Sequence, residues 1–174
     1  MIFMNGMKVN KSSLNGEILL PPSKSLAHRA IIAASLSDGV SEIDNVIFSE
    51  DILVTMEAMR QLGARIEKRI NEENRYTNSI AKIAVPLDKR DGSKQVVIDC
   101  GESGSTLRFI IPLALKILGK VAFTGKGKLI ERPLDVYYKL FDEKNIKYIN
   151  SNGKLPLEVE GQFTKWIYRL EGNV

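Results

Sequence analysis

The pattern of apolar and polar positions predicts four helices. Each contains apolar residues at helical spacing, and together they cover residues 25–37, 49–63, 105–118 and 133–143. The first and third are apolar almost all round, so we expect every face of both helices to be covered. Pro112 lies inside the third helix and removes one of its hydrogen bonds, which predicts a kink or a local break. Pro133 is expected in the first turn of the fourth helix.

Short apolar runs between these helices predict strands. They lie at residues 40–46, 64–70, 80–85, 96–100, 121–124, 146–149 and 155–159. The run at 96–100 has the pattern of a buried strand. Residues 71–74 are expected to form a polar turn, and residues 125–128 a loop.

The order of the predicted elements repeats after about 80 residues. Arg29 and Arg108 occupy the same place in the first helix of each copy, and Gly63 and Asn145 end the second helix of each. The sequence therefore predicts an α/β fold of two βαβαββ-like units, with a third unit beginning at Phe163. Because that third unit holds no helix, we expect the chain to be a piece of a longer protein.

The starts of the two apolar helices carry the same residue types. Residues 22–29 and 101–108 each place small hydroxyl residues before the helix and an arginine in its first turns. Such a start offers free backbone N–H groups and the positive end of the helix dipole to an anion. Two such starts, each with a cation, predict a pocket for an anionic substrate.

Charged residues near the first helix start are candidates for this pocket. Lys24 opposes the dipole of its own helix, which favours a ligand anion as its partner over simple exposure to solvent. Arg29 lies one turn after Ser25, so both can face one side, and a salt bridge from Arg29 to Asp51 is the alternative. Arg108 is either a second cation at the pocket or a structural cation between the two units.

The second helix start holds further candidates. Gly101 and Gly104 bracket a tight turn, where glycine permits either an ordinary turn or the close approach of a ligand. Arg132 stands beside a third helix start. Lys126 and Lys128 are expected to be solvated loop charges.

The sequence gives His28 and Cys100 weaker support as functional residues than the charged residues of the helix starts. His28 could transfer protons near neutral pH, but no carboxylate partner is evident, so we favour a surface or packing role. Cys100 ends an apolar strand and is expected to be a buried, inert thiol. A single cysteine excludes an internal disulfide, and no His, Cys or Asp cluster has the spacing of metal ligands, so we expect no metal.

Composition limits the partners of the chain. An apolar content of 44% and a charged content of 26% are ordinary for a globular protein of 174 residues. The net charge of +4 comes from scattered lysines and arginines, which disfavours nucleic acid and fits small anionic metabolites. The first ten residues lack a signal-peptide pattern, and the longest apolar run, 107–118, is too short to cross a membrane. We expect a soluble, cytoplasmic protein.

Three stretches resemble the enolpyruvyl transferase family. They are residues 20–30, 99–108 and 131–134, and the resemblance covers nearly the whole chain. It implies an inside-out α/β fold of two similar domains, each of three βαβαββ units. On this division residues 1–20 hold a leading strand that belongs with the C-terminal domain. Residues 21–174 are then an incomplete N-terminal domain, with units at about 21–86 and 95–160 and the start of a third at 161–174.

The resemblance is to the branch of the family that acts on shikimate 3-phosphate in aromatic amino acid biosynthesis. It implies that the 5-hydroxyl of shikimate 3-phosphate adds to C2 of phosphoenolpyruvate and that phosphate then leaves. No metal or organic cofactor takes part. The acidic and basic groups for this reaction lie mainly in the family's C-terminal domain. We therefore expect the chain alone to be inactive.

The resemblance also implies roles for individual residues. Lys24 resembles the catalytic lysine that contacts both substrates. The implied ligands of shikimate 3-phosphate are Ser25 and Arg29, those of phosphoenolpyruvate are Gly104 and Arg132, and additional candidates are Ser105 and Arg108.

Glu102 departs from the family, in which many relatives carry asparagine. An acid near a phosphate site is unfavourable unless it is paired or turned away. We therefore expect Glu102 to affect the affinity for the phosphate-bearing substrate. It is also expected to affect the response to glyphosate, which occupies the phosphoenolpyruvate site in this family.

Two other functions stay open. The branch that uses UDP-N-acetylglucosamine is disfavoured, because Ser25 follows Lys24 and residues 125–131 contain no cysteine. The second alternative is a non-catalytic module that binds phosphorylated ligands.

Overall fold

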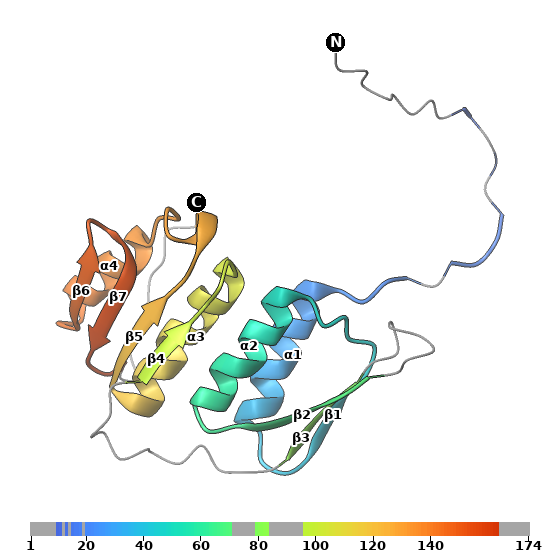
Figure 1. Ribbon diagram of the computed structural model, residues 1–174, viewed down its shortest axis with the longest axis horizontal. Coiled ribbons are helices and arrows are strands. Elements are labelled where there is room, and N and C mark those ends of the chain that lie inside the picture. Colours follow the sequence, from blue (N-terminus) through green and yellow to red (C-terminus); the bar gives the residue numbers. More distant parts are fainter. Residues whose placement is uncertain are drawn as a thin grey trace.

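A computed structural model of the chain describes residues 20–70, 79–83 and 96–163, together with residues 10, 11, 13 and 15–18 (Figure 1). Its elements are α1 (Lys24–Leu36), β1 (Ser41–Ile43), α2 (Glu50–Gln61), β2 (Arg65–Arg69), β3 (Ser79–Ile83), β4 (Val96–Asp99), α3 (Gly104–Leu118), β5 (Lys120–Thr124), the short 3₁₀ helix η2 (Gly127–Leu129), α4 (Asp135–Glu143), β6 (Lys147–Ser151) and β7 (Lys154–Glu160). No helix in this part of the chain is long and apolar enough to cross a lipid bilayer.

Two sheets repeat one topology. In the first sheet, β3 lies between β1 and β2 and is antiparallel to both. In the second sheet, β7 lies between β5 and β6 and is again antiparallel to both. The second sheet also contains β4, which is parallel to β5. The succession α1, β1, α2, β2, β3 thus returns as α3, β5, α4, β6, β7, and the predicted α/β repeat is confirmed.

The predicted helices are all present, with boundaries within about two residues of the expected ones. Each predicted strand is present as well. The polar turn at residues 71–74 and the third unit beyond residue 163 lie outside the described residues, as does most of the leading strand within residues 1–20.

The strand β4 is not buried on both faces, which corrects the prediction. Ile98 is fully buried, whereas Val97 is 50% exposed. One face of β4 packs on α2, whereas the face that carries Val97 and Asp99 is exposed in the described part of the chain. A continuous apolar run does not distinguish these two situations.

The helix α1 also departs from its prediction. Ala27 and Ile31 are buried, but Leu26 is 68% exposed and Leu36 is 47% exposed. This helix packs against α2 and β1, so only part of its apolar surface has a neighbour within the described residues. The helix α3 is closer to expectation, since most of its apolar residues are buried or half-buried.

The helix α3 continues through Pro112 without a break. Proline has no N–H to donate to the carbonyl of Arg108, which lies one turn earlier. The hydroxyl of Tyr137, on α4, donates to this carbonyl instead. The compensation explains why the predicted local break is absent, and the helix ends as predicted at Gly119, whose φ is 74°.

Pro133 differs from its prediction in detail, and the start of α2 lacks a side-chain cap. Pro133 precedes the N-cap residue Leu134, so it lies just outside α4 and not in its first turn. Ser49 occupies the N-cap position of α2, but its hydroxyl makes no capping hydrogen bond and is buried without a partner among the described residues.

One apolar core runs through both repeats. It includes Ile31 of α1, Ile52 and Met56 of α2, Ile110 of α3 and Phe123 of β5, all with 1% exposure or less. The helix α2 packs against both α1 and α3 and so joins the repeats. Figure 1 shows that α1, α2 and α3 begin at the same end of the molecule.

Candidate functional site

The first helix start presents its polar groups to solvent. The hydroxyl of Ser23 caps α1 by accepting from the backbone N–H of Leu26 at 3.3 Å, and the first turn contains no acidic residue. The guanidinium of Arg29 donates to the carbonyl of Ser25 at 2.9 Å and also to its hydroxyl. The prediction that Ser25 and Arg29 face one side is confirmed.

Lys24 is paired with Asp51 of α2. Its Nζ lies 2.6 Å from Oδ2 of Asp51, and the two side chains are 59% and 28% exposed. The alternative that Arg29 pairs with Asp51 is wrong, because among the described residues this carboxylate pairs with Lys24, and Arg29 donates to Ser25 instead. An exposed pair of this kind contributes little to stability and can exchange partners at low cost.

Arg29 connects the first helix start to the second repeat. Its guanidinium carbon lies 5.1 Å from the centroid of the Phe109 ring on α3. A guanidinium at that distance from a ring gains a cation–π attraction. Phe109 therefore helps to set the direction of the Arg29 side chain, a contact that the sequence pattern did not predict.

The second helix start repeats the arrangement of the first. The hydroxyl of Ser103 caps α3 by accepting from the N–H of Thr106 at 3.2 Å. Before it, the N–H of Gly101 donates to the carboxylate of Asp99 at 2.9 Å. Gly101 has a φ of 53°, which favours glycine. Most of the turn from β4 into α3 is buried, including Gly104, while Ser105 in the first turn of α3 is exposed.

Two guanidinium groups converge on Gly104. A Cβ atom at position 104 would lie 2.3 Å from Nη1 of Arg132 and 3.0 Å from Nη1 of Arg108, so only glycine fits this place without moving them. Arg108 also donates to the carbonyl of Pro133 at 3.1 Å. Among the described residues, no carboxylate pairs with either guanidinium. A helix N-terminus with two such cations is a strongly positive place.

Arg108 therefore does not hold the two repeats together. The hydrogen bonds of its guanidinium go to the carbonyls of Gly104 and Pro133, both in the second repeat. Of the two predicted roles for Arg108, the structure supports a cation beside Gly104. Ser105, the other additional candidate, lies exposed in the first turn of the same helix.

Glu102 is directed toward the loop that leads to Arg132. A Cβ atom at Gly127 would lie 2.5 Å from the carboxylate carbon of Glu102, and Gly127 has a φ of 55°. Nearby, Nζ of Lys126 lies 2.5 Å from Oε1 of Glu50 on α2. The hydrogen bond to Glu50 raises the pKa of Lys126, and the charge of Glu102 adds to this effect.

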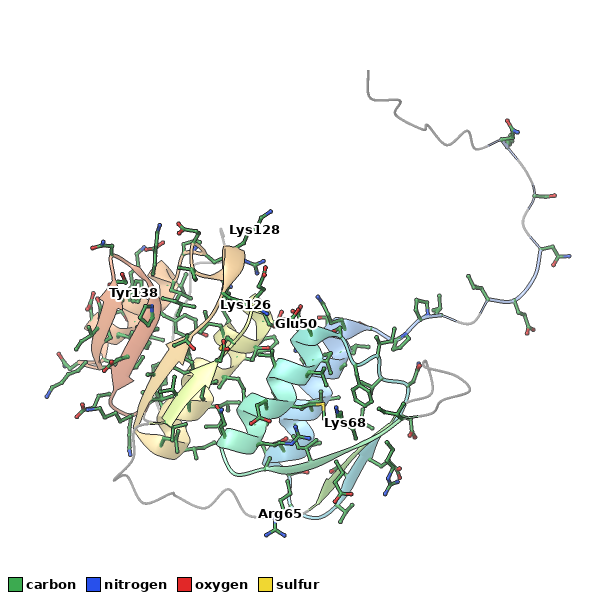
Figure 2. All side chains as sticks on the ribbon, viewed as in Figure 1. Glu50, Arg65, Lys68, Lys126, Lys128 and Tyr138 are labelled. Atoms are coloured by element: carbon green, nitrogen blue, oxygen red, sulfur yellow. The ribbon has the colours of Figure 1, made fainter. Side chains whose placement is uncertain are left out.

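The prediction that Lys126 is a solvated loop charge is thus wrong in one respect. Lys126 is exposed, but it forms an ion pair that connects the two repeats. Figure 2 shows Lys126 and Glu50 close together at the end where the helices begin, while Arg65 and Lys68 lie toward the other end.

His28 is a buried packing residue, with 1% exposure, and not a surface residue. Its Nδ1 lies 2.7 Å from Oγ1 of Thr55. Burial lowers the pKa of His28, the charge of Asp51 opposes this shift, and those of Lys24 and Arg29 add to it. The histidine is therefore uncharged at neutral pH.

Cys100 is fully buried, as predicted. Burial, with a smaller effect of Asp99, raises the pKa of its thiol to about 12. The thiol therefore stays protonated and unreactive near neutral pH. The described residues contain no group of three or more His, Cys, Asp or Glu side chains that could hold a metal ion.

Sequence reasoning found the charged residues of both helix starts and missed several of their partners. Those missed were Thr55, Thr106, Phe109 and Tyr137. Thr55, Phe109 and Tyr137 lie outside the three stretches that carry the resemblance. Thr106 lies inside one of them, but its contact with Thr55 on α2 depends on the fold.

Fold and site together define a repeated α/β protein with two helix starts, each carrying basic side chains, at one end. The chain belongs to the EPSP synthase family (3-phosphoshikimate 1-carboxyvinyltransferase), whose sequence pattern matches residues 9–171. The predicted resemblance is thereby confirmed.

Curated relatives carry the same description. The chain is 50% identical over 171 residues to the 3-phosphoshikimate 1-carboxyvinyltransferase of Clostridium novyi, 46% identical over 172 residues to that of Clostridium beijerinckii and 43% identical over 173 residues to that of Clostridioides difficile. Each match covers 98% of this chain but 39% of the relative. The chain thus spans about two fifths of the length of these relatives.

Solved structures share the fold. An EPSP synthase from Acinetobacter baumannii superimposes with a TM-score of 0.72 over 88% of this chain and 34% of that one, at 22% identity. A second structure of EPSP synthase from this organism gives 0.69 over 84% of this chain and 32% of that one, at 21% identity. At such identities the likeness shows the fold alone, and it confirms the predicted fold class.

Proposed function

We propose that this chain is the part of a 3-phosphoshikimate 1-carboxyvinyltransferase that binds the anionic groups of its substrates. The observation that carries the proposal is the convergence of Arg108 and Arg132 on Gly104 at the start of α3. The helix α1, whose first turns contain Lys24 and Arg29, begins at the same end of the molecule as α3. The reaction would transfer the enolpyruvyl group of phosphoenolpyruvate to the 5-hydroxyl of shikimate 3-phosphate.

The roles of the residues follow from their chemistry. Ser25 and Arg29 would bind shikimate 3-phosphate, because Arg29 keeps guanidinium donors near the surface beside a hydroxyl. Gly104 and Arg132 would bind phosphoenolpyruvate, whose phosphate or carboxylate suits a helix N-terminus and a guanidinium fork. Ser105 and Arg108 would add further donors to that anion.

Lys24 would act on the reacting atoms. Addition of the hydroxyl to C2 of phosphoenolpyruvate gives a tetrahedral intermediate, from which phosphate leaves. An ammonium group between two polyanions stabilises negative charge as it develops on them. The exchangeable pair with Asp51 leaves Lys24 available for this task.

The reaction also needs a proton donor and a base. We expect these groups in the rest of the enzyme, since this chain covers 39% of the relatives. Residues 1–20 would provide a strand that belongs with the other domain, and residues 21–174 an incomplete N-terminal domain. The chain alone would be inactive and would need its C-terminal domain as partner. Neither metal nor organic cofactor enters this proposal, and the enzyme would work in the cytoplasm.

Two measurements test the proposal. In the first, the 174-residue chain is titrated with shikimate 3-phosphate and followed by phosphorus NMR. We expect a saturable shift that is lost in Arg29→Ala and kept in Lys116→Ala, an exposed cation at the far end of α3. In the second, the chain replaces the corresponding part of the Clostridium novyi relative, and the chimera is assayed for turnover.

The outcomes separate the candidate functions. Turnover by the chimera supports the transferase. Binding of shikimate 3-phosphate without turnover in a folded chimera supports the non-catalytic module. Equal binding by the parent and Arg29→Ala contradicts the assignment of the α1 start.

A further inference from the structure

Four buried polar side chains form one line of hydrogen bonds across three helices. Nδ1 of His28 lies 2.7 Å from Oγ1 of Thr55, and that oxygen lies 2.7 Å from Oγ1 of Thr106. Thr106 in turn donates to the hydroxyl of Ser103 at 2.7 Å. All four side chains have 2% exposure or less. Buried polar groups destabilise a fold unless they are paired, so this line is tied to one arrangement of the helices.

The line of hydrogen bonds connects the two proposed anion-binding helix starts. His28 precedes Arg29 on α1, while Ser103 and Thr106 flank Gly104 on α3. Thr55 stands between them on α2, one turn after Asp51, the residue that pairs with Lys24. The helix α2 therefore holds α1 through Asp51 and Thr55, and it holds α3 through Thr55.

The position of the imidazole proton follows from the partners of His28. Nε2 is buried and has no hydrogen-bond partner among the described residues. A proton on Nε2 would leave a buried N–H without an acceptor, which native structures rarely tolerate. A proton on Nδ1 donates to Thr55 and leaves only a lone pair unmatched. The charged groups that act on the ring are Asp51, Lys24 and Arg29, and the two cations disfavour a second proton.

We propose that Thr55 is a positioning residue of the anion site, which fixes the start of α1 relative to the start of α3 through neutral His28 and Thr106. Thr55 is fully buried in the described part of the chain and would touch no substrate. The identity of the ligand rests on the proposed function, whereas the line of hydrogen bonds is independent of it. Both the hydroxyl and its position matter, because one oxygen contacts both neighbours. Since Thr106 donates its own proton to Ser103, the proton of Thr55 is the one available to Thr106, and the carbonyl of Asp51 at 3.1 Å is its competing acceptor.

The substitution Thr55→Val keeps the shape of the side chain and removes the shared oxygen. Thr55→Ser keeps the oxygen and is the conservative control. Ser35→Ala is a second control, because Ser35 is a buried hydroxyl on α1 whose bond goes to the carbonyl of Ile31 in its own helix.

The single histidine of the 174-residue chain makes the test direct. The ¹⁵N signals of the imidazole show which nitrogen carries the proton, and amide signals of Ser25 and Gly104 report on the two helix starts. We expect a proton on Nδ1 in the parent, Thr55→Ser and Ser35→Ala. In Thr55→Val the imidazole signals and both amide signals should move.

Binding supplies the second readout. In a phosphorus NMR titration with shikimate 3-phosphate, we expect Thr55→Val to lose about tenfold in affinity and Thr55→Ser to stay within about twofold of the parent. A proton on Nε2 in the parent overturns the proposal. So do unchanged Gly104 signals, or unchanged affinity, in a folded Thr55→Val chain.

Two failures remain distinguishable. If the parent does not bind shikimate 3-phosphate, the proposed function is contradicted, and the spectra of His28 and Gly104 still decide whether Thr55 positions the helices. If Thr55→Val does not fold, as judged by circular dichroism, Thr106→Val breaks the same line from α3 and is measured in its place.

Discussion

The guanidinium of Arg132 occupies the space that a side chain at position 104 would need. Replacing Gly104 by alanine should therefore displace Arg132 while leaving α3 intact, since alanine is a good helix former. In the chimera we expect the KM for phosphoenolpyruvate to rise by about tenfold or more, the scale of a lost charge-assisted contact. Steady-state kinetics at varied phosphoenolpyruvate concentrations would check this. An unchanged KM would show that Gly104 does not belong to the proposed anion site.

Removal of either cation of the α1 start should have a larger effect. We expect Lys24→Ala and Arg29→Ala to lower turnover of the chimera by at least about 100-fold, the scale of a charged transition-state contact. Lys116→Ala, at the far end of α3, should leave turnover within about twofold of the parent. Near-normal kinetics in both site variants would refute the assignment of this helix start.

The ring of Phe109 should contribute to binding through Arg29. Its cation–π contact is of a type that contributes about 0.5–1 kcal/mol at exposed sites, so Phe109→Leu should weaken binding of shikimate 3-phosphate about two- to fivefold. Phe109→Tyr keeps a ring and should bind like the parent. Isothermal titration calorimetry of the parent, Phe109→Leu and Phe109→Tyr measures the three affinities for shikimate 3-phosphate. Equal affinities of the parent and Phe109→Leu would show that the contact does not orient Arg29.

The hydroxyl of Tyr137 should stabilise α3. It supplies the donor that Pro112 lacks, so Tyr137→Phe leaves the carbonyl of Arg108 without this partner and should cost about 1–3 kcal/mol in the free energy of unfolding. The control is Tyr138→Phe, whose hydroxyl donates at 3.1 Å to the carbonyl of Gly153 in the turn between β6 and β7. Urea unfolding should show the smaller loss for this control, and the reverse order would contradict the role of Tyr137.

Burial of His28 should make stability depend on pH. Its pKa is lowered from 6.5 in the folded chain, so below that value the unfolded chain takes up the proton first. This contribution to stability is complete above about pH 6.5 and declines as the pH falls toward the folded pKa, by up to about 1.4 kcal/mol per pH unit. Melting temperatures between about pH 8 and pH 5 should show this decline in the parent and a smaller one in His28→Asn. Parallel curves would indicate that His28 is not buried in its neutral form.

Local signals in the sequence were enough to predict the helices, the repeat and the charged residues of both helix starts. Ser23 and Ser103 cap helices, and Gly119 ends one, through interactions with their own neighbours in the chain. Such interactions leave a pattern at fixed spacing, which a single sequence displays.

The contacts between elements could not be predicted in the same way. Asp51 pairs with Lys24, and Thr55 with His28, across 27 positions of the sequence, and nothing in the local pattern marks these partners. The exposed face of α1 was missed for a related reason. The apolar side chain of Leu26 indicates that it could pack against an apolar neighbour, but it does not indicate whether the described residues provide one.

The pair between Lys24 and Asp51 places a carboxylate where the proposed function would place an anionic ligand. Because a carboxylate already lies beside the ammonium group, an incoming phosphate or carboxylate would replace one negative partner with another. The gain on binding is then the difference between two ion pairs and not the full attraction of an isolated cation. The selectivity of Lys24 for a ligand would thus depend on how much more favourable its ion pair with the ligand is than its ion pair with Asp51.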